Sequence, residues 1–283
     1  MKNIKIGWIG LGNMGIPMAE QLIKAEYPVT VYNRSQGKEY KLKEMGARVA
    51  NSPQVLASET DVIILMVTND KAIEAVFEAE DGLLKTELTG KTIINMSTVS
   101  PAIAKKMAAS CKERNAHYLD APVSGSVKQA ETGQLVIMVG GEQSAFEEVK
   151  PILDQLGKLS KRVGETGAGN TAKLAINSLL ALYTQGLAET ILFANDKGIN
   201  PADLLELIGQ AAIGNVYTKI KGDAILNDQY KAAFALKHIV KDLRLAKDEG
   251  ISTPLAKTAL KTFEDAESAY GEEDLVAIFK ALR

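Results

Sequence analysis

Short apolar runs alternate with amphipathic segments through the first half of the chain. The apolar runs lie at residues 4–9, 28–32, 61–67, 91–95 and 134–139, with a last one near 159–163. Most runs of this kind are buried strands of a parallel sheet, and segments of helical periodicity lie between them. Strands that alternate with helices build a doubly wound sheet. The pattern therefore predicts an α/β fold with an N-terminal Rossmann-type domain, residues 1–164.

The second half of the chain has no strand pattern. A segment at about 168–197 is apolar on almost every side, which predicts one helix, roughly 40 Å long and buried all round. Further helical segments lie at 216–226, 236–249, 253–269 and 275–282. We therefore expect an all-α C-terminal domain, residues 165–283, that begins with this long interdomain helix. Because so apolar a helix often buries its surface against another subunit, we also expect a homodimer or homotetramer.

Lys173 is the only charged residue between Glu165 and Glu189 on this expected helix. A buried ammonium group is costly unless it faces a cleft or a partner. Asn177 projects from the same face one helical turn later. A lysine beside a neutral amide is suited to proton transfer to or from a bound oxygen atom. The alternative is that the Lys173 side chain extends past its neighbours into solvent.

A glycine-rich turn follows the first apolar run directly and precedes a helical segment. Its residues are Gly10, Leu11, Gly12, Asn13, Met14 and Gly15. In a dinucleotide-binding turn the first glycine permits the tight bend, the second lets the backbone approach a pyrophosphate, and the third lets helix and strand pack closely. The N–H groups at the start of the helix bind the phosphates. We therefore expect these six residues to bind a dinucleotide cofactor.

The second strand ends in Asn33, Arg34 and Ser35, with no acidic residue among them. Sites that prefer NAD usually place an acidic residue there for the ribose 2′-hydroxyl, whereas an arginine suits a 2′-phosphate. Asn33 and Ser35 can add neutral hydrogen bonds, and Lys38 is a further candidate cation. The alternative is that Arg34 is an ordinary exposed loop charge. On balance the residues favour NADP(H) over NAD(H).

Other candidate cofactor contacts follow the ends of later strands. Met66 and Val67 close a buried strand at the carboxyl edge of the sheet, where ligands of such folds bind. Ser97 and Thr98 follow the next strand. Ser100 precedes a proline, a pair that is typical of a helix N-cap and its first helical residue. Capping accounts for Ser100 but not for Ser97 and Thr98, so we expect these two residues to face the cofactor.

A small polar turn, Ser124-Gly125-Ser126, follows the strand expected at about 117–122. Its hydroxyl and backbone N–H groups can bind an anion. The alternative is an ordinary loop.

Composition narrows the class of protein further. The chain has 283 residues, 46% hydrophobic and 24% charged, which suits a globular two-domain protein. A net charge of −2 and a pI near 5.9 give no general attraction to nucleic acid or to an anionic membrane. No apolar run approaches the ~18 residues of a membrane span, and the first residues lack the apolar core of a signal peptide. The single cysteine, Cys111, is consistent with a reducing cytoplasm. Neither histidine has a partner at metal-ligand spacing, so we expect no metal.

Four motifs in order resemble those of the β-hydroxyacid dehydrogenase family, which includes 3-hydroxyisobutyrate dehydrogenase, tartronate semialdehyde reductase and glyoxylate/succinic semialdehyde reductase. The motifs are the glycine turn at 9–15, Asp-Ala-Pro-Val-Ser-Gly at 120–125, Gly-x-Gly-x-x-x-Lys-x-x-x-Asn at 167–177, and the segment at 234–243. The resemblance covers essentially the whole chain.

The resemblance implies hydride transfer between a nicotinamide and the carbonyl carbon of a small acid. Lys173 would be the general acid in reduction and the base in oxidation, and Asn177 would hold the substrate or orient the lysine. The substrate carboxylate would be bound by Ser124 and Gly125, with Ser126 beside them. Further cofactor contacts would come from Thr98, Phe234 and Lys241.

The Ser126–Leu135 segment, the Asn33-Arg34-Ser35 loop and residues 241–246 are similar to the glyoxylate/succinic semialdehyde reductase branch. This implies an NADPH-dependent reductase of glyoxylate and succinic semialdehyde. Asn95 departs from the family, which commonly has an acidic residue there. The presence of Lys173 argues against the related imine reductases. The alternatives are a 3-hydroxyisobutyrate or other 3-hydroxyacid dehydrogenase that works oxidatively with NAD(P), and a non-catalytic protein that keeps a dinucleotide site for regulation.

Overall fold

The computed structural model describes residues 3–283 and divides into two compact units, residues 1–173 and 174–283. The division falls inside the long helix α8 (Ala168–Asp196), whose first six residues belong to the first unit. The domain boundary expected between residues 164 and 165 stays a prediction. Among residues 3–283, no helix combines the length and the apolarity that a membrane span requires.

The first unit is built on one mixed sheet that is mostly parallel. Within residues 3–283 its nine strands are β1 (Ile6–Ile9), β2 (Val29–Tyr32), β3 (Arg48–Val49), β4 (Val62–Leu65), β5 (Thr92–Asn95), β6 (His117–Asp120), β7 (Val123–Ser124), β8 (Leu135–Gly140) and β9 (Gly157–Gly164). Six of them lie in the order β3-β2-β1-β4-β5-β6 and are all parallel. This is the strand order of a Rossmann fold, so the expected N-terminal architecture is confirmed. β8 pairs antiparallel with β6 and β7 and parallel with β9, which adds a mixed edge.

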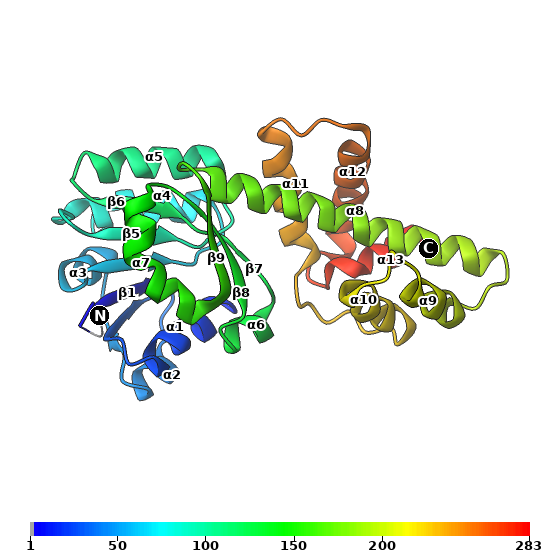
Figure 1. Cartoon of the computed structure of the whole chain (residues 1–283), viewed down its shortest axis with the longest axis horizontal. Coiled ribbons are helices and arrows are strands. Elements are labelled where there is room, and N and C mark those ends of the chain that lie inside the picture. Colours follow the sequence, from blue (N-terminus) through cyan, green and yellow to red (C-terminus); the bar gives the residue numbers. More distant parts are fainter. Residues whose placement is uncertain (1–2) are drawn as a thin grey trace. The chain divides into compact units, whose positions relative to one another are not determined.

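Helices cover both faces of this sheet (Figure 1). One face carries α1 (Gly15–Lys24), α2 (Tyr40–Glu44), α6 (Val127–Glu131) and α7 (Gln143–Leu156), and the other carries α3 (Pro53–Glu59), α4 (Asp70–Glu78), η1 (Leu83–Lys85) and α5 (Pro101–Lys112). Successive strand residues point to opposite faces. Thus Trp8 and Ile64 lie in one core, and Ile63 and Leu65 lie in the other. Each of these side chains is fully buried, so the sheet is sandwiched between two apolar layers.

Among its described residues the second unit contains helices and no strand, as expected. After α8 come α9 (Pro201–Gln210), α10 (Val216–Leu226), α11 (Leu236–Asp248), α12 (Pro254–Tyr270), η2 (Leu275–Ala277) and α13 (Ile278–Leu282). Ala181 and Ala188 of α8 share one core with Leu243 and Phe263, and Ile191 shares a second core with Ile225.

Within this single chain α8 is not buried on every side, so burial all round stays a prediction for an assembly. Ile176 is 43% exposed, Leu179 is 64% exposed and Phe193 is 65% exposed. The other face of the helix is buried at Ala181 and Ala188. The apolar composition of α8 therefore exceeds what this single chain covers.

Candidate active site

The glycine turn lies at the carboxyl end of β1, beside β2 and β4. The three glycines of the turn differ in how much space surrounds them. Gly10 has φ +103°, and a Cβ there would collide with the Met66 carbonyl oxygen. A Cβ at Gly15 would collide with the carbonyl oxygen of Gly10, whereas a Cβ at Gly12 would have nothing within 4 Å. Gly10 and Gly15 are therefore required by the fold, while the backbone at Gly12 is open to a ligand.

Side chains around the turn hold it in place. The buried indole N–H of Trp8 donates to the Gly10 carbonyl at 3.1 Å. The backbone N–H of Leu11 donates to Asn33 Oδ1 at 2.9 Å, and Asn33 Nδ2 donates to the Ser35 carbonyl at 2.7 Å. Asn33 thus joins the cofactor turn to the loop after β2, a role that the sequence did not reveal. The Arg34 and Ser35 side chains next to it are exposed.

The loops after β4 and β5 are joined by a chain of hydrogen bonds. The N–H of Val67 donates to Ser97 Oγ at 2.9 Å, and the N–H of Ser97 donates to Asn95 Oδ1 at 3.0 Å. Asn95 Nδ2 in turn donates to the Tyr118 hydroxyl at 3.0 Å. Ser97 is fully buried, so the expectation that it faces a cofactor is wrong, because its hydroxyl supports the end of β4. The same contacts give Asn95 a physical role that the sequence left without one.

Thr98, by contrast, follows these hydrogen-bonded residues and is partly exposed. Met66 and Val67 are partly exposed at the end of β4. Ser100 Oγ accepts from the Ile103 N–H at 3.0 Å, which confirms Ser100 as the N-cap of α5. Three of the candidate cofactor contacts therefore remain at the accessible carboxyl edge of the sheet, where the strand order reverses between β1 and β4.

The start of α8 is fixed by the carboxylate of Asp120, for which the sequence motifs had indicated no role of its own. Asp120, at the end of β6, is fully buried. Its Oδ1 accepts from the Gly167 N–H at 2.7 Å, and its Oδ2 accepts from the Asn170 N–H at 2.8 Å. A carboxylate at a helix N-terminus bonds N–H groups that have no partner inside the helix and complements the helix dipole. Burial raises the pKa of the Asp120 carboxyl, and the hydrogen bonds from Gly167 and Asn170 oppose that rise.

Lys173 lies in the second turn of α8, just after the turn that Asp120 holds. The residue is only 9% exposed. Asn177 follows on the same face of the helix and is 2% exposed. The expected amine and amide are therefore both buried and four residues apart on α8.

The Ser124-Gly125-Ser126 turn joins β7 to α6. Gly125 has φ +142°, and a Cβ there would lie 2.7 Å from a methyl carbon of Leu135. The Ser126 N–H donates to Gln129 Oε1 at 2.8 Å, and the Ser126 hydroxyl bonds the same oxygen, which makes Ser126 the N-cap residue of α6. Ser124 is partly exposed and Gly125 is exposed. Ser126 therefore caps a helix, in addition to being a candidate substrate-binding residue like Ser124 and Gly125.

In the second unit, Asn177 and Lys241 meet at one carboxylate. Asn177 Nδ2 donates to Asp242 Oδ2 at 2.6 Å, and Lys241 Nζ lies 2.9 Å from Asp242 Oδ1. Asp242 is 2% exposed, whereas the Lys241 side chain is 28% exposed. Asp242 thus orients one amide and one ammonium group at the same time.

The segment around Phe234 is held by another buried carboxylate. Asp274 Oδ2 accepts from the N–H groups of Ala233 at 3.0 Å and Phe234 at 3.2 Å, and Asp274 Oδ1 lies 2.6 Å from Lys221 Nζ. The Phe234 ring stacks on the ring of His238 with a centroid separation of 6.3 Å. The backbone before α11 is therefore fixed where the candidate cofactor residue Phe234 lies.

Comparison with known proteins gives one consistent result. The family model described as the NAD binding domain of 6-phosphogluconate dehydrogenase matches residues 5–167, and the one described as "NAD-binding of NADP-dependent 3-hydroxyisobutyrate dehydrogenase" matches residues 167–282. Chloroplastic glyoxylate/succinic semialdehyde reductase 2 of Arabidopsis thaliana is 35% identical, covering 99% of this chain and 80% of the relative. The chain belongs to the β-hydroxyacid dehydrogenase family.

Further members of the family agree with this assignment. The 2-(hydroxymethyl)glutarate dehydrogenase of Eubacterium barkeri is 35% identical, covering 99% of this chain and 95% of the relative. The solved structure of Mycobacterium tuberculosis 3-hydroxyisobutyrate dehydrogenase with L-serine has a TM-score of 0.91 at 28% identity and covers 99% of both chains. This β-hydroxyacid dehydrogenase is therefore an oxidoreductase that acts on a hydroxy acid with a nicotinamide cofactor.

Sequence reasoning missed the carboxylates that support the site in this β-hydroxyacid dehydrogenase. Asp242 gave a usable signal, because it lies within the helical stripe of Ile239, Leu243 and Ala246, all of which are buried. Asp120 gave a weaker one, as an acidic residue at the end of an apolar strand. Within residues 3–283, no three His, Cys, Asp or Glu side chains are grouped as metal ligands would be.

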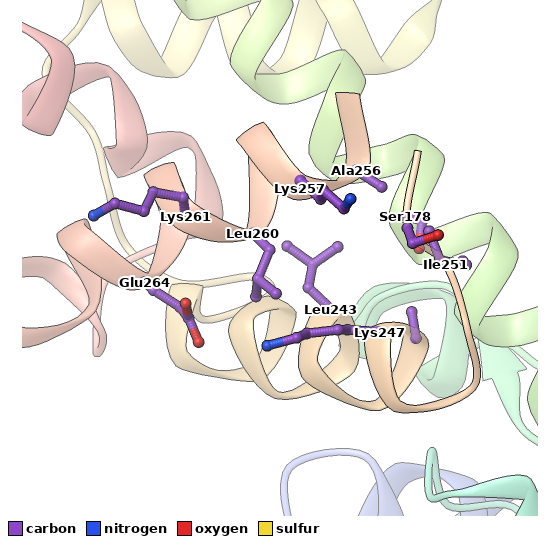
Figure 2. A pocket seen from close by; sticks show the side chains of 11 residues that line it. Ser178, Leu243, Lys247, Ile251, Ala256, Lys257, Leu260, Lys261 and Glu264 are labelled. Carbon is purple, nitrogen blue, oxygen red and sulfur yellow. The ribbon is translucent and has the colours of Figure 1, made fainter. Parts of the chain in front are cut away.

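A cavity of about 450 Å³ lies in the helical unit of this β-hydroxyacid dehydrogenase (Figure 2). Its lining includes Leu243 and Lys247 of α11 and Leu260 and Lys261 of α12, with Ser178 of α8 at one side (Figure 2). None of the candidate site residues lines it. The cavity therefore does not mark the candidate active site.

Proposed function

We propose that this β-hydroxyacid dehydrogenase reduces short aldehyde acids with NADPH, and that glyoxylate and succinic semialdehyde are its preferred substrates. The observation that carries the proposal is the buried Lys173 on α8, one turn before Asn177. The A. thaliana relatives named as glyoxylate/succinic semialdehyde reductases support the choice of substrates.

The residues of the glycine turn fit a dinucleotide. The backbone at Gly12 has open space in front of it, and the turn leads directly into α1, whose N-cap residue Met14 makes no side-chain capping bond. When bound, the nicotinamide supplies the hydride for the carbonyl carbon. Gly10, Leu11, Gly12, Asn13, Met14 and Gly15 would bind the pyrophosphate, and further contacts would come from Met66, Val67, Thr98, Phe234 and Lys241.

Arg34 supports the preference for NADP(H). Its guanidinium is exposed at the end of β2 and can form a bidentate, charge-assisted bond to a 2′-phosphate. Ser35 adds a hydroxyl, and Asn33 holds the loop in place through Leu11 and the Ser35 carbonyl.

In the proposed mechanism Lys173 donates a proton to the carbonyl oxygen as hydride arrives at the carbon. In the reverse direction its neutral amine accepts the hydroxyl proton. Asn177 holds the substrate or orients Lys173 through a hydrogen bond from its amide. Asp242 fixes the orientation of that amide. Ser124 and Gly125 bind the substrate carboxylate through a hydroxyl and a backbone N–H group. Ser126 shapes this turn as the N-cap residue of α6.

A second candidate is a 3-hydroxyisobutyrate or other 3-hydroxyacid dehydrogenase that works oxidatively. The TM-score of 0.91 to the M. tuberculosis 3-hydroxyisobutyrate dehydrogenase favours it. Steady-state kinetics on glyoxylate, succinic semialdehyde and methylmalonate semialdehyde, each with NADPH and with NADH, separates the two. Much faster turnover of methylmalonate semialdehyde would exclude the reductase assignment.

The role of Lys173 has its own test. Lys173→Ala should lower kcat by roughly 10²–10⁴-fold, the usual contribution of a positioned proton donor. The affinity for NADPH, measured by fluorescence titration, should stay nearly unchanged. Simultaneous loss of activity and of NADPH binding would assign Lys173 a structural role.

We also propose that the enzyme is a homodimer or homotetramer in a reducing compartment such as the cytoplasm. The exposed Ile176, Leu179 and Phe193 on α8 support an assembly that covers them. The sole cysteine, Cys111, is a buried free thiol, which supports a reducing environment. Sedimentation as a monomer at micromolar concentration would exclude the assembly.

A further inference from the structure

A buried polar network ties the first turn of α8 to two strands of the sheet. Asp120 of β6 accepts from the N–H groups of Gly167 and Asn170, and the side chain of Asn170 extends the network to the loop after β5. Asp120 and Asn170 are both fully buried. All these residues belong to the first unit.

Asn170 makes contacts in two directions from one side chain. Its Oδ1 accepts from the Val99 N–H at 3.0 Å, and its Nδ2 lies 3.4 Å from Asp120 Oδ2. Val99 directly follows Thr98, a candidate cofactor contact. Lys173 follows Asn170 by three residues, so the two lie on neighbouring positions of one helical face. The amide of Asn170 therefore connects the Thr98 loop to the helical turn that carries Lys173.

The first turn of α8 has little room to move. A Cβ at Gly169 would lie 2.5 Å from the carbonyl oxygens of Asp120 and Met138. A Cβ at Gly140 would likewise lie 2.8 Å from the Gly169 N–H nitrogen. With the backbone packed this closely against β6 and β8, the Asn170 side chain determines how the neighbouring loop meets the helix.

We propose that Asn170 is a positioning residue for catalysis, which holds the Thr98 loop and the Lys173 turn in one fixed geometry. The inference rests on the proposed function, because it gives Lys173 the proton transfer. A displacement of about 1 Å at a reacting group can lower the rate about 10²-fold, so the bond from Val99 to Asn170 matters even though Asn170 is fully buried.

The test compares Asn170→Ala and Asn170→Ser with the parent enzyme. The serine hydroxyl retains a short polar group beside Asp120 but is too short to accept from Val99, so this variant breaks the bridge with the least disturbance of the core. Asn200→Ala is the matched control, because Asn200 Oδ1 also accepts one backbone N–H, that of Ala202 at 2.8 Å, at an exposed helix end. Each variant is assayed per folded enzyme, with the folded fraction taken from thermal melts.

We expect kcat to fall roughly 10- to 100-fold in both Asn170 variants, while the Kd for NADPH changes less than about twofold. The hydrogen isotope effect on kcat, measured with NADPH deuterated at the transferred position, should be at least as large as in the parent. In a Lys173→Ala background, Asn170→Ser should cause no further loss, because a residue that acts through Lys173 has nothing left to position. Asn200→Ala should keep the parent kcat.

Three results would overturn the inference. They are a kcat within about twofold of the parent, an effect that adds to that of Lys173→Ala, or a loss of NADPH affinity that matches the loss of kcat. Failure of the proposed function gives a different result, since Lys173→Ala alone would then keep the parent activity. If Asn170→Ala does not fold, Asn170→Ser carries the same test.

Discussion

Replacing Asp242 tests whether one carboxylate holds both Asn177 and Lys241. In Asp242→Ala, Asn177 Nδ2 loses its 2.6 Å acceptor while the residue remains 2% exposed. A buried donor without a partner costs about 1–3 kcal/mol. Lys241 loses the Asp242 carboxylate at 2.9 Å, but its side chain is 28% exposed, so this loss costs little. We therefore expect the free energy of unfolding to fall by about 2 kcal/mol.

The conservative variant sharpens this expectation. In Asp242→Asn the single side-chain oxygen can accept from Asn177, and the new NH₂ group then faces Lys241. The buried hydrogen bond survives without its charge, so the loss should be about 1 kcal/mol. Asp265→Asn is the matched control, because Asp265 pairs with Lys261 at 2.7 Å while 62% exposed and should contribute less than about 1 kcal/mol.

Thermal melts and steady-state kinetics measure the two consequences together. For chains of this size about 1 kcal/mol corresponds to roughly 2–4 °C, so Asp242→Ala should melt roughly 4–8 °C below the parent. Its kcat should fall as well, because the Asn177 amide is no longer oriented. A melting temperature within about 1 °C of the parent would refute the reasoning, since the carboxylate would then contribute nothing to the fold.

Three further variants or measurements follow from the structure. Arg34→Asp should weaken NADPH much more than NADH in fluorescence titrations, because it replaces a phosphate-binding cation by an anion; equal effects on both coenzymes would remove Arg34 from the 2′-phosphate site. Gly12→Val should fold with the parent melting temperature yet lose coenzyme binding, whereas Gly15→Val should fail to fold, since only Gly12 has open space for a Cβ. Burial raises the pKa of Cys111 to about 12, so iodoacetamide at pH 9 should label the folded enzyme roughly 10²–10³-fold more slowly than the urea-unfolded chain. The same shift means that the stability contributed by the Cys111 thiol is complete below its unfolded pKa of 9.0 and is lost as pH rises toward 12; rapid labelling of the native enzyme would contradict both statements.

The sequence predicted the arrangement of strands and helices well because hydrophobic periodicity is a local signal. The run at 91–95 became β5 (Thr92–Asn95), and the segment at 168–197 became α8 (Ala168–Asp196). Ser100 caps α5 as its residue type and the following proline indicate. These features depend on residues a few positions apart, and the sequence contains them directly.

The burial of α8 could not be predicted in the same way. Periodicity reports which residues are apolar, but not which of them this chain covers. Leu179 and Ala181 are both apolar, yet the first is 64% exposed and the second is fully buried. Only the packing of distant segments, or a second subunit, distinguishes the two positions.

The polar supports of the site were missed for a related physical reason. Asn33 accepts from the N–H of Leu11, Asn170 from that of Val99, and Asp120 from that of Gly167, with sequence separations of 22, 71 and 47 residues. In each case a side chain, fully buried at Asn170 and Asp120 and partly buried at Asn33, satisfies a backbone N–H of a loop or a helix end. A sequence shows which residue types can accept such bonds, but not which N–H group will lack a partner.

These supports also hold the loops that carry several of the candidate residues. The accessible groups at the edge of the sheet, such as Arg34 and Thr98, lie on loops, and loops hold a geometry only when their backbone groups are bonded. Asn33 fixes the loop that carries Arg34, and Asn170 bonds the residue after Thr98. An amide side chain suits both places, because it accepts one N–H and donates elsewhere without adding a charge beside the proposed site of an anionic coenzyme. An aspartate in either position would add a negative charge, and at Asn170 it would stand beside the Asp120 carboxylate, where two buried acids ionise together only at high cost.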